Sequence, residues 1–434
     1  MFSTNKKRAA MLAVFAVALG GVALTPAHAT TKTLTIWADE TRGPHLIELF
    51  GAVEDQDAGD FVDGYVIDVK TQTNFDALKA ALDNATSASG PDIVLGPNDW
   101  VASGVKNGKL AALTLPAAIK ADFTANQLGD LSYKGKLYGV PLDVNNVAMV
   151  RNAGVPKAAA ATFGAMVDYY KANKVSQGLT AGLCIIGGGT SWGGMSVYSA
   201  LGMQPYRMKS GKVDVTLSKP GKAATSGDPI SANFINNLKT YVLEPNGDNW
   251  QSNGFYAPWD GGGVSCEADF KAGKVPFGIL GNWQPDFTTS AIVATAQPVP
   301  GVTAGTYGSA FGSVSGALLT SFAATKGNLA AAKSMLNYFG SRAGQRDYQK
   351  IEKRPHANAK ASKFGNSFQK AFANAAGLAS VPQIGAILNG TGGNSWWDLA
   401  GNYWYRVANN GENLTTTTAN LSALLKANIV AGTK

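Results

Sequence analysis

The sequence predicts an α/β protein whose mostly parallel sheets carry helices on both faces. Short apolar runs of strand length alternate with segments of helical periodicity, which is the order of strand–helix–strand units. The chain has 434 residues, more than one hydrophobic core usually organises, so we expect two domains. Hydrophobic residues make up 45% and charged residues 15%, a balance that argues against a largely disordered chain.

A first series of alternating elements follows residue 30. Each expected strand is a short apolar run, and each expected helix spaces its apolar residues three or four apart. Phe75, Leu78 and Leu82, for example, share one helical face. The series consists of strands at 34–37, 65–69 and 92–95 and of helices at 45–53, at 75–82 and from Asp99 onward.

A second series begins near residue 147, and the last quarter of the chain is expected to be mainly helical. No repeat and no low-complexity tether separates the two series, which indicates a chain that crosses between the domains more than once. The expected elements are strands at 147–150, 183–186 and 275–280 and helices at 163–170, 234–243, 329–339, 364–375, 396–407 and 421–430.

The first 29 residues have the pattern of a cleavable signal peptide. Lys6, Lys7 and Arg8 precede an apolar stretch at 9–24, and the small-residue triplet 27–29 (AHA) predicts cleavage after Ala29. The apolar stretch is shorter than the ~20 residues that span a bilayer. No cysteine lies near the cut, so we expect a periplasmic or secreted protein that is not lipid-anchored.

Charge and residue counts exclude several classes of function. The net charge is +8, but the basic residues are scattered and form no stripe with aromatic residues, so we expect no nucleic-acid partner. Three His and two Cys exclude a four-cysteine zinc or iron–sulfur site. His45 and His356 have no ligand spacing, and we expect neither a metal nor a cofactor.

The two cysteines of this exported chain can form one disulfide. An even cysteine count in an oxidising compartment favours a bridge between Cys184 and Cys266. Cys184 lies in an apolar run, and Cys266 precedes a short helical pattern. The alternative is a buried Cys184 and an unpaired Cys266.

The sequence allows two enzymatic interpretations. The segment 189–193 (GTSWG) fits a serine nucleophile elbow around Ser191, but His356 is the only histidine that follows it. A glycine-rich turn at a helix start explains the same residues. Asp39, Glu40 and Asp99 could form a carboxylate pair for glycoside cleavage, or they are solvated loop acids. A secreted glycoside hydrolase or serine esterase therefore stays open as the alternative to a protein that is not an enzyme.

The aromatic residues carry the clearest functional signal. The chain has 9 Trp, and several stand beside turn residues outside the apolar runs, among them Trp100, Trp192, Trp283 and Trp397. An indole ring stacks on the apolar face of a pyranose, while nearby carboxylates and amides bond its hydroxyls. Packing in a core or a lid is the alternative for each of these residues.

Ordered stretches across nearly all of the exported chain resemble the extracellular solute-binding proteins of carbohydrate ABC importers, in particular the maltose/maltodextrin-binding group. The resemblance implies a two-lobed, periplasmic-binding-protein-like fold of type II with a hinge, a sugar ligand, a membrane permease as partner, and a monomer. The stretches are 34–42 (LTIWADETR), 91–95 (PDIVL), 98–100 (NDW), 133–141 (YKGKLYGVP), 270–274 (FKAGK), 281–283 (GNW) and 396–397 (WW).

The same resemblance implies lobe boundaries and a binding site. The first lobe would contain 30–145 and 316–353, and the second 146–315 and 354–434. The implied ligand contacts are Asp39, Arg42, Asp99 and Trp100 in the first lobe, Asn145 between the lobes, and an aromatic tray of Trp192, Trp283 and Trp397 in the second.

Four positions depart from the maltodextrin group. Asn145 and Thr190 stand where that group typically has acidic residues, Gly96 where it has an aromatic, and Trp100 where it has an arginine. We therefore expect altered recognition of the sugar hydroxyls. Maltose or a malto-oligosaccharide is the first expectation, and a related oligosaccharide remains open.

Overall fold

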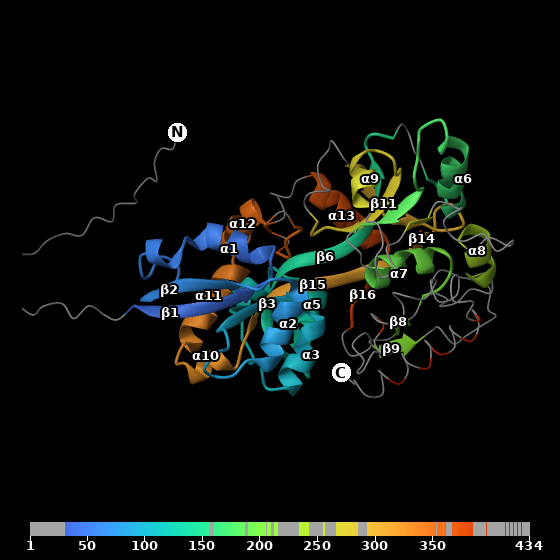
Figure 1. Cartoon of the computed structure of the whole chain (residues 1–434). Helices are drawn as coiled ribbons and strands as arrows, with labels where there is room; N and C mark the ends of the chain where they lie inside the picture. Colours follow the sequence, from blue (N-terminus) through green and yellow to red (C-terminus); the bar gives the residue numbers. More distant parts are fainter. Residues whose placement is uncertain are drawn as a thin grey trace, which may run out of the picture.

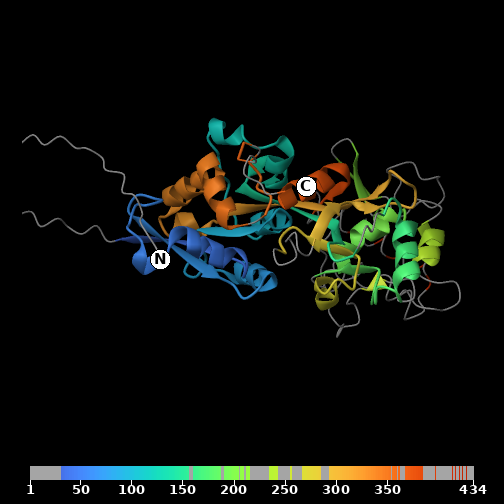
Figure 2. The ribbon, with the colours of Figure 1, turned by 90° about the horizontal axis from the view of Figure 1, so that it is seen from above.

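A computed structural model of the chain has an elongated shape, with the N-terminal elements at one end and the elements around residues 160–280 at the other (Figure 1). Seen from above, the two ends are again separate and are joined along the middle (Figure 2). The structure describes residues 31–155, 160–186, 190–204, 206–209, 212–215, 234–242, 255–256, 266–284, 293–352, 354–358, 360–361 and 367–384, with Trp396 and isolated positions from 413 to 427.

One large sheet runs the length of the molecule in the order β10-β7-β11-β6-β15-β3-β1-β2, with β12 beside β6 and β16 beside β15. Its ends are parallel, since β1 pairs with β2 and β3, and β7 pairs with β10 and β11. Its middle is antiparallel. The strands are β1 Lys32–Ala38, β2 Tyr65–Thr71, β3 Ile93–Pro97, β6 Gly139–Asn152, β7 Leu183–Ile185, β10 Phe255–Tyr256, β11 Phe277–Gly281, β12 Val293–Gln297, β15 Ala310–Leu319 and β16 Ser380–Pro382.

The strands β6 and β15 connect the two ends, and their antiparallel pairing is called the crossing below. Residues 139–146 of β6 pair with β15, while residues 147–151 pair with β11. One strand thus belongs to both ends of the sheet. The elements on the β3 side of the crossing are called the N-terminal half, and those on the β11 side the C-terminal half.

The N-terminal half buries both faces of its sheet. Leu34 and Ile36 of β1 pack on one face against α1, α11 and α12, whereas Val94 of β3 packs on the other against α2 and α3. Asn74 caps α2 by accepting a hydrogen bond from the amide of Ala77. The helices are α1 Arg42–Phe50, α2 Phe75–Asn84, α3 Asp99–Lys106, α4 Ala117–Lys120, α5 Ala125–Asp130, α10 Phe322–Thr325, α11 Leu329–Gly340 and α12 Arg342–Ile351, with the 3-10 turn η1 Val53–Asp55.

The C-terminal half has its own core. Phe163, Phe277 and Trp396 are fully buried there, together with Met149 of β6. Its helices are α6 Phe163–Asn173, α7 Thr190–Ala200, α8 Phe234–Tyr241, α9 Glu267–Lys271 and α13 Ser367–Leu378. Short strand pairs complete the fold: β4 Ser132–Tyr133 with β5 Lys136–Leu137, β8 Tyr206–Lys209 with β9 Lys212–Val215, and β13 Val299–Pro300 with β14 Tyr307–Gly308.

The two cores meet within the crossing strands. On β6, Leu142 packs in the N-terminal core and Val147 in the C-terminal core. On β15, Ala317 packs in the N-terminal core and Phe311 in the C-terminal core. The predicted boundaries near 145 and 316 fall between these positions. Ala357 packs with the N-terminal core, although the expectation placed 354–434 in the second lobe. The lobe ranges stay a prediction.

The α/β class is confirmed, and most expected elements lie within a few residues of their predicted positions. The largest difference in extent is β6, which has 14 residues where a four-residue strand was expected. Two helices are shifted by three residues: α1 spans Arg42–Phe50 instead of 45–53, and α13 spans Ser367–Leu378 instead of 364–375. β15 was not expected at all. The signal peptide, Trp397 and, apart from Trp396 and isolated positions, the helices predicted at 396–407 and 421–430 lie outside the described residues. No helix in the described ranges is long and apolar enough to span a membrane.

Cys184 and Cys266 lie at disulfide distance in the C-terminal half. Cys184 is on β7 and Cys266 precedes α9, and their Cα atoms are 6.2 Å apart. Both side chains are buried against Phe270 and Phe372. A bond here would tie β7 to α9 across 82 positions of sequence.

Reduction should lower the stability of the protein by about 2–5 kcal/mol, because a bridge across so long a segment restricts the unfolded chain. Urea unfolding with and without reductant measures the difference, and the double variant Cys184→Ala/Cys266→Ala should be insensitive to reductant. Two titratable thiols in denaturant before any reduction would contradict the bridge.

Candidate functional site

Polar side chains gather where β6 and β15 cross. Asp143 and Asn145 lie two residues apart on β6, opposite Ser315 and Ser313 of β15. The amide of Asn145 donates to Ser315 Oγ at 2.5 Å. All four residues are buried, in strands whose other residues are largely apolar. Buried polar groups in the middle of a sheet need hydrogen-bond partners. The candidate site is therefore centred on these four residues of the crossing.

Arg42 satisfies the carboxylate of Asp143 from the first turn of α1. Its Nε and Nη2 donate to Asp143 Oδ2 at 3.1 and 2.8 Å, and its Nη1 lies 2.5 Å from Asp39 Oδ2. Asp39 also accepts from the backbone amide of Arg42, so it holds the start of α1. The side chains of Arg42 and Asp143 are only 3% and 1% exposed. Because both side chains are buried, each ion has lost its hydration, and the attraction between the two charges offsets this free-energy cost.

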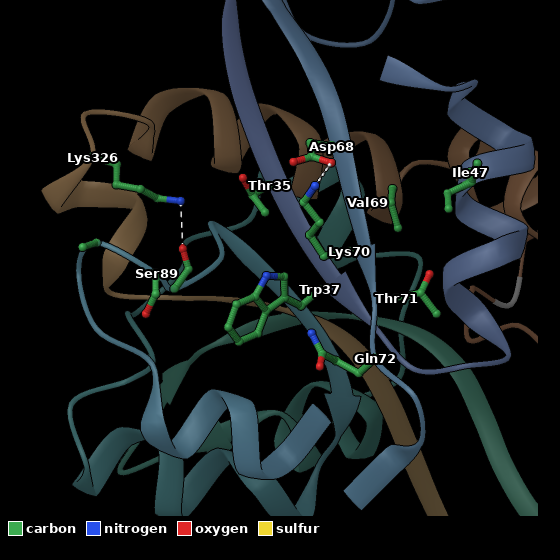
Figure 3. A pocket seen from close by; sticks show the side chains of 12 residues that line it. Thr35, Trp37, Ile47, Asp68, Val69, Lys70, Thr71, Gln72, Ser89 and Lys326 are labelled. Carbon is green, nitrogen blue, oxygen red and sulfur yellow. Dashed lines mark hydrogen bonds and ion pairs between the residues drawn. The ribbon is translucent and has the colours of Figure 1, made fainter. Parts of the chain in front are cut away.

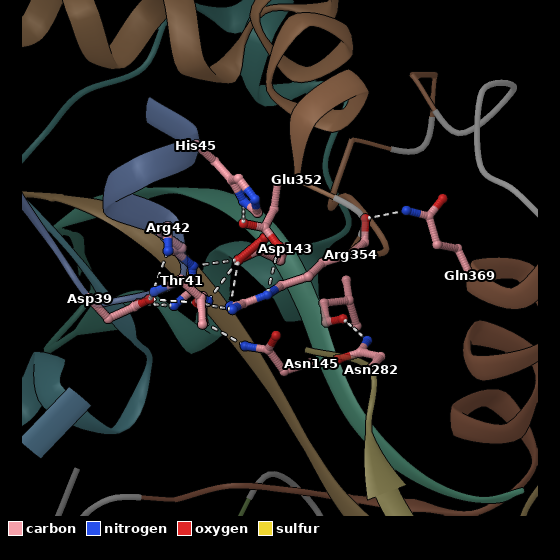
Figure 4. Close-up of polar contacts among 12 residues, drawn as sticks. Asp39, Thr41, Arg42, His45, Asp143, Asn145, Asn282, Glu352, Arg354 and Gln369 are labelled. Atoms are coloured by element: carbon pink, nitrogen blue, oxygen red, sulfur yellow. Dashed lines mark hydrogen bonds and ion pairs between the residues drawn. The ribbon is translucent and has the colours of Figure 1, made fainter. Parts of the chain in front are cut away.

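A second arginine reaches Asp143 from the segment after α12. Figure 4 shows Arg42 and Arg354 converging on Asp143. The guanidinium of Arg354 lies 4.0 Å from Asp143 and 2.9 Å from Glu352, and it donates to Thr41 at 2.5 Å. Gln369 holds the same segment by donating to the carbonyl of Arg354.

His45 lies at the outer end of this ion cluster, which consists of Asp39, Arg42, Asp143, Glu352, Arg354 and His45. Its Nδ1 is 2.8 Å from Glu352, and its side chain is 32% exposed, the highest value in the cluster. Three carboxylates face two guanidinium groups, so protonation of His45 makes the cluster neutral.

The cluster shifts the pKa values of its members. The hydrogen bond to Glu352 raises the pKa of His45 above its usual range, although partial burial opposes this. Burial acts to raise the pKa of Asp39, but Arg42 and Arg354 outweigh it and hold the pKa well below its usual range. Asp39 is therefore a carboxylate at neutral pH.

Three asparagines surround the crossing with unused acceptors. The Nδ2 groups of Asn98 and Asn282 donate to the carbonyls of Gln383 and Val144, both at 2.7 Å. The Oδ1 atoms of Asn98, Asn145 and Asn282 are buried, and within the described part of the chain none accepts a hydrogen bond. Such an acceptor costs about 1–3 kcal/mol, so each marks a place where a donor would be stabilising.

Two indoles lie together beside these amides. The ring centroids of Trp192 on α7 and Trp283 after β11 are 5.3 Å apart, and both side chains are partly exposed. A Cβ on Gly281 would lie 2.4 Å from the ring of Trp283, so only glycine lets this indole fold back over the strand end. Trp283 directly follows Asn282 in the chain, so the aromatic pair lies next to one of the three unused amide oxygens.

Asp99 and Trp100 begin α3, and both are buried. Trp100 packs in a core cluster with Leu78 and Leu131 and lies against Phe75, with 4.9 Å between ring centroids. A Cβ on Gly96 would meet its ring at 2.4 Å. Gly96 and Trp100 are two of the four positions that depart from the maltodextrin group, and the two departures are linked. The indole of Trp100 on α3 fills the space that a side chain at position 96 on β3 would occupy.

The predicted ligand residues thus lie in different surroundings. Asn145 is at the crossing, Trp192 and Trp283 are paired, Asp39 and Arg42 are engaged in the ion cluster, and Trp100 is in a core. Thr190 and Ser191 are in the first turn of α7, with side chains outside what the structure describes. A cavity of about 660 Å³ lies elsewhere, over β1 and β2. Among the described residues no cluster of His, Cys, Asp or Glu is arranged to hold a metal.

Sequence reasoning missed five residues of this site. Asn98 and Asn282 lie in the stretches 98–100 (NDW) and 281–283 (GNW), where each stands beside a tryptophan that was predicted as a ligand contact. Asp143 carried a weaker signal, as the one acid in the apolar run of β6. Glu352 and Arg354 had none, because only the fold brings the segment after α12 to the crossing.

Comparison with known proteins places these features in a family context. The family described as bacterial extracellular solute-binding protein matches residues 58–377, more than half of the chain. A maltooligosaccharide ABC transporter solute-binding lipoprotein of Streptococcus pneumoniae serotype 4 (strain ATCC BAA-334 / TIGR4) is 30% identical over 144 residues, as is that of strain ATCC BAA-255 / R6. The aligned part covers 33% of this chain and 32% of each relative, so the chain matches about a third of their length.

The variant Asp143→Asn should lose about 3–5 kcal/mol of stability, because it leaves two buried guanidinium groups without their shared carboxylate. Urea unfolding gives the value. The matched control is Asp269→Asn, whose exposed pair with Lys274 at 4.0 Å should contribute less than about 1 kcal/mol. Equal stability of the two variants would show that the cluster does not hold the crossing.

His45 and His356 should affect stability with opposite dependence on pH. The pKa of His45 is higher in the folded protein than in the unfolded chain, so protonation of His45 stabilises the fold. This contribution is complete at pH values below the pKa in the unfolded chain and is lost as the pH rises through the pKa in the folded protein. Burial lowers the pKa of His356, so its contribution is present above the unfolded pKa and is lost as pH falls. Unfolding free energies at pH 5–9 for His45→Gln and His356→Gln measure this, and parallel pH profiles in the two variants would refute it.

Proposed function

The chain belongs to the bacterial extracellular solute-binding proteins, which bind solutes and are not enzymes, and we propose that its solute is a sugar held at the crossing. The protein would be the binding component of a carbohydrate ABC importer and would deliver the sugar to a membrane permease. The two streptococcal relatives, which are maltooligosaccharide ABC transporter solute-binding lipoproteins, support this class. Export as a monomer without a lipid anchor is part of the proposal.

The observation that carries the proposal is the set of unused amide oxygens beside two indoles. Asn98, Asn145 and Asn282 present acceptors without donors, and sugar hydroxyls are donors. Trp192 and Trp283 add partly exposed rings that can stack on the apolar face of a pyranose. Hydroxyl donors and a stacking face occur together in a sugar, so one ligand class satisfies both features.

These groups belong to different parts of the fold, which explains how binding would change its shape. Asn98 is in the N-terminal half, Asn145 is on the crossing strand, and Trp283 is in the C-terminal half. A sugar that contacts all three favours the arrangement in which the halves are close. The amide oxygens are shielded from solvent in the described arrangement, which is therefore a closed one. The sugar-free protein would also adopt a more open arrangement, which a sugar enters and from which the halves close.

The ion cluster favours a neutral sugar over a charged one. Asp39 and Arg42 already neutralise one another within the cluster, and Asp143 is engaged by both arginines. Asn145, where the maltodextrin group typically has an acid, donates to Ser315 and offers an uncharged acceptor that is unused. We therefore propose maltose, a malto-oligosaccharide or a related neutral oligosaccharide as the ligand.

A thermal-shift screen tests the function directly. Maltose, maltotriose, trehalose, cellobiose and sucrose are compared with buffer. A ligand at 100 times its Kd adds about 2.7 kcal/mol and should raise Tm by a few degrees. One sugar family that shifts Tm would identify the substrate class, while no shift with any sugar would contradict the proposal.

The variant Trp283→Ala should bind the sugar found in that screen at least tenfold more weakly, because stacking and burial of one large ring contribute ~1.5–3 kcal/mol. Calorimetry measures the affinity. Ser191→Ala is the control and should bind like the unmodified protein. Unchanged affinity in Trp283→Ala would remove the indole from the site, and ester hydrolysis that vanishes in Ser191→Ala would overturn the binding function.

A further inference from the structure

One face of β1 carries a tryptophan among polar neighbours. Leu34, Ile36 and Ala38 point into the N-terminal core and are fully buried. The alternate residues Thr35 and Trp37 lie on the opposite face, where Trp37 is partly exposed. Part of its indole is therefore accessible on that face.

This face forms the floor of the cavity over β1 and β2. The register pairs Thr35 with Asp68 and Trp37 with Lys70, so these four side chains share one face. The cavity measures about 660 Å³, within the range of about 300–1,000 Å³ typical of small-molecule sites. Figure 3 shows the Trp37 indole in its centre, between Lys70 and Gln72 on one side and Ser89 on the other. Part of the ring also packs against the core cluster beneath α2 and α3.

The charged groups around this cavity are already paired. Lys70 Nζ lies 3.1 Å from Asp68, and Lys326 Nζ lies 3.2 Å from Asp92 and donates to the carbonyl of Gly90 at 2.9 Å. Asp92 is buried and does not line the cavity, but it neutralises Lys326, so each charge around the cavity has a counter-ion within 3.2 Å. The neutral side chains of Thr35, Gln72 and Ser89 supply hydroxyl and amide groups instead. A neutral ligand that presents hydroxyls and one apolar face matches this lining.

We propose that the cavity over β1 and β2, with Trp37 as its stacking surface, is a second carbohydrate site that binds one neutral pyranose unit. The indole covers the apolar face of the ring, and Asp68, Lys70 and Gln72 bond its hydroxyls. The lining comes from the N-terminal half alone, so binding here does not depend on closure of the two halves. With one aromatic surface the site is weak, with a Kd on the order of 1 mM. Its role would be to hold a longer or neighbouring sugar at the surface of the protein.

Indole NMR tests this site separately from the crossing. The protein carries ¹⁵N-labelled tryptophan, and Trp37→Phe identifies the Trp37 resonance. Titration with maltotriose is performed on the unmodified protein and on Trp283→Ala, in which binding at the crossing is weakened. The Trp37 resonance should move in both proteins. Sorbitol, which has hydroxyls but no ring face, should not move it.

Gln72→Ala should weaken the Trp37 response at least threefold, while Gln177→Ala, an exposed glutamine of the C-terminal half, should leave it unchanged. A stationary Trp37 resonance, an equal response to sorbitol, or a response that disappears in Trp283→Ala would overturn the proposal. A response only to an extended peptide would also overturn it, because it would assign the cavity to pairing with the edge strand β2. Binding of maltotriose is followed by NMR at Trp37 and by calorimetry at the crossing. A negative result for one site therefore does not decide the result for the other.

Discussion

The structure depends on a single strand that serves two halves. The 14 residues of β6 pair with β15 in the N-terminal half and with β11 and β12 in the C-terminal half. At the point of transition the strand carries a buried carboxylate, Asp143. Burial of such an ion costs several kcal/mol, and only a well-arranged set of counter-ions offsets it. Arg42 and Arg354 provide that set, so the crossing and the ion cluster require one another.

This requirement joins three segments that are far apart in the sequence. Asp39 and Arg42 follow β1, Asp143 is on β6, and the segment with Glu352 and Arg354 follows α12. The amide of Val144 donates to the carbonyl of Pro355 at 2.8 Å, so backbone pairing supports the ionic contacts. The segments thus form one anchored base beside the amide oxygens of Asn98, Asn145 and Asn282. A ligand at the crossing would meet a floor whose charges are already satisfied, which suits a neutral sugar.

The sequence predicted the elements that have a clear period and missed those that do not. The short apolar run of β1 and the helical spacing of apolar residues in α2 and α11 could be recognised, because each of these elements buries one regular set of side chains. β15 (AFGSVSGALL) mixes Gly and Ser with apolar residues and has no alternation, because it is buried on both faces. At the site, aromatic residues beside turns could be recognised as Trp192 and Trp283. The engagement of Arg42 by Asp143, across 101 positions, depends on tertiary contacts that no local pattern records.

A sugar that bridges the two halves at the crossing would make the protein more compact. Small-angle X-ray scattering of the protein, with and without the sugar that raises its Tm, tests this most directly. Saturating sugar should lower the radius of gyration, because the halves close on the ligand. Trp283→Ala should need a correspondingly higher sugar concentration for the same change. Saturated binding with an unchanged radius of gyration would mean that the sugar does not bridge the halves.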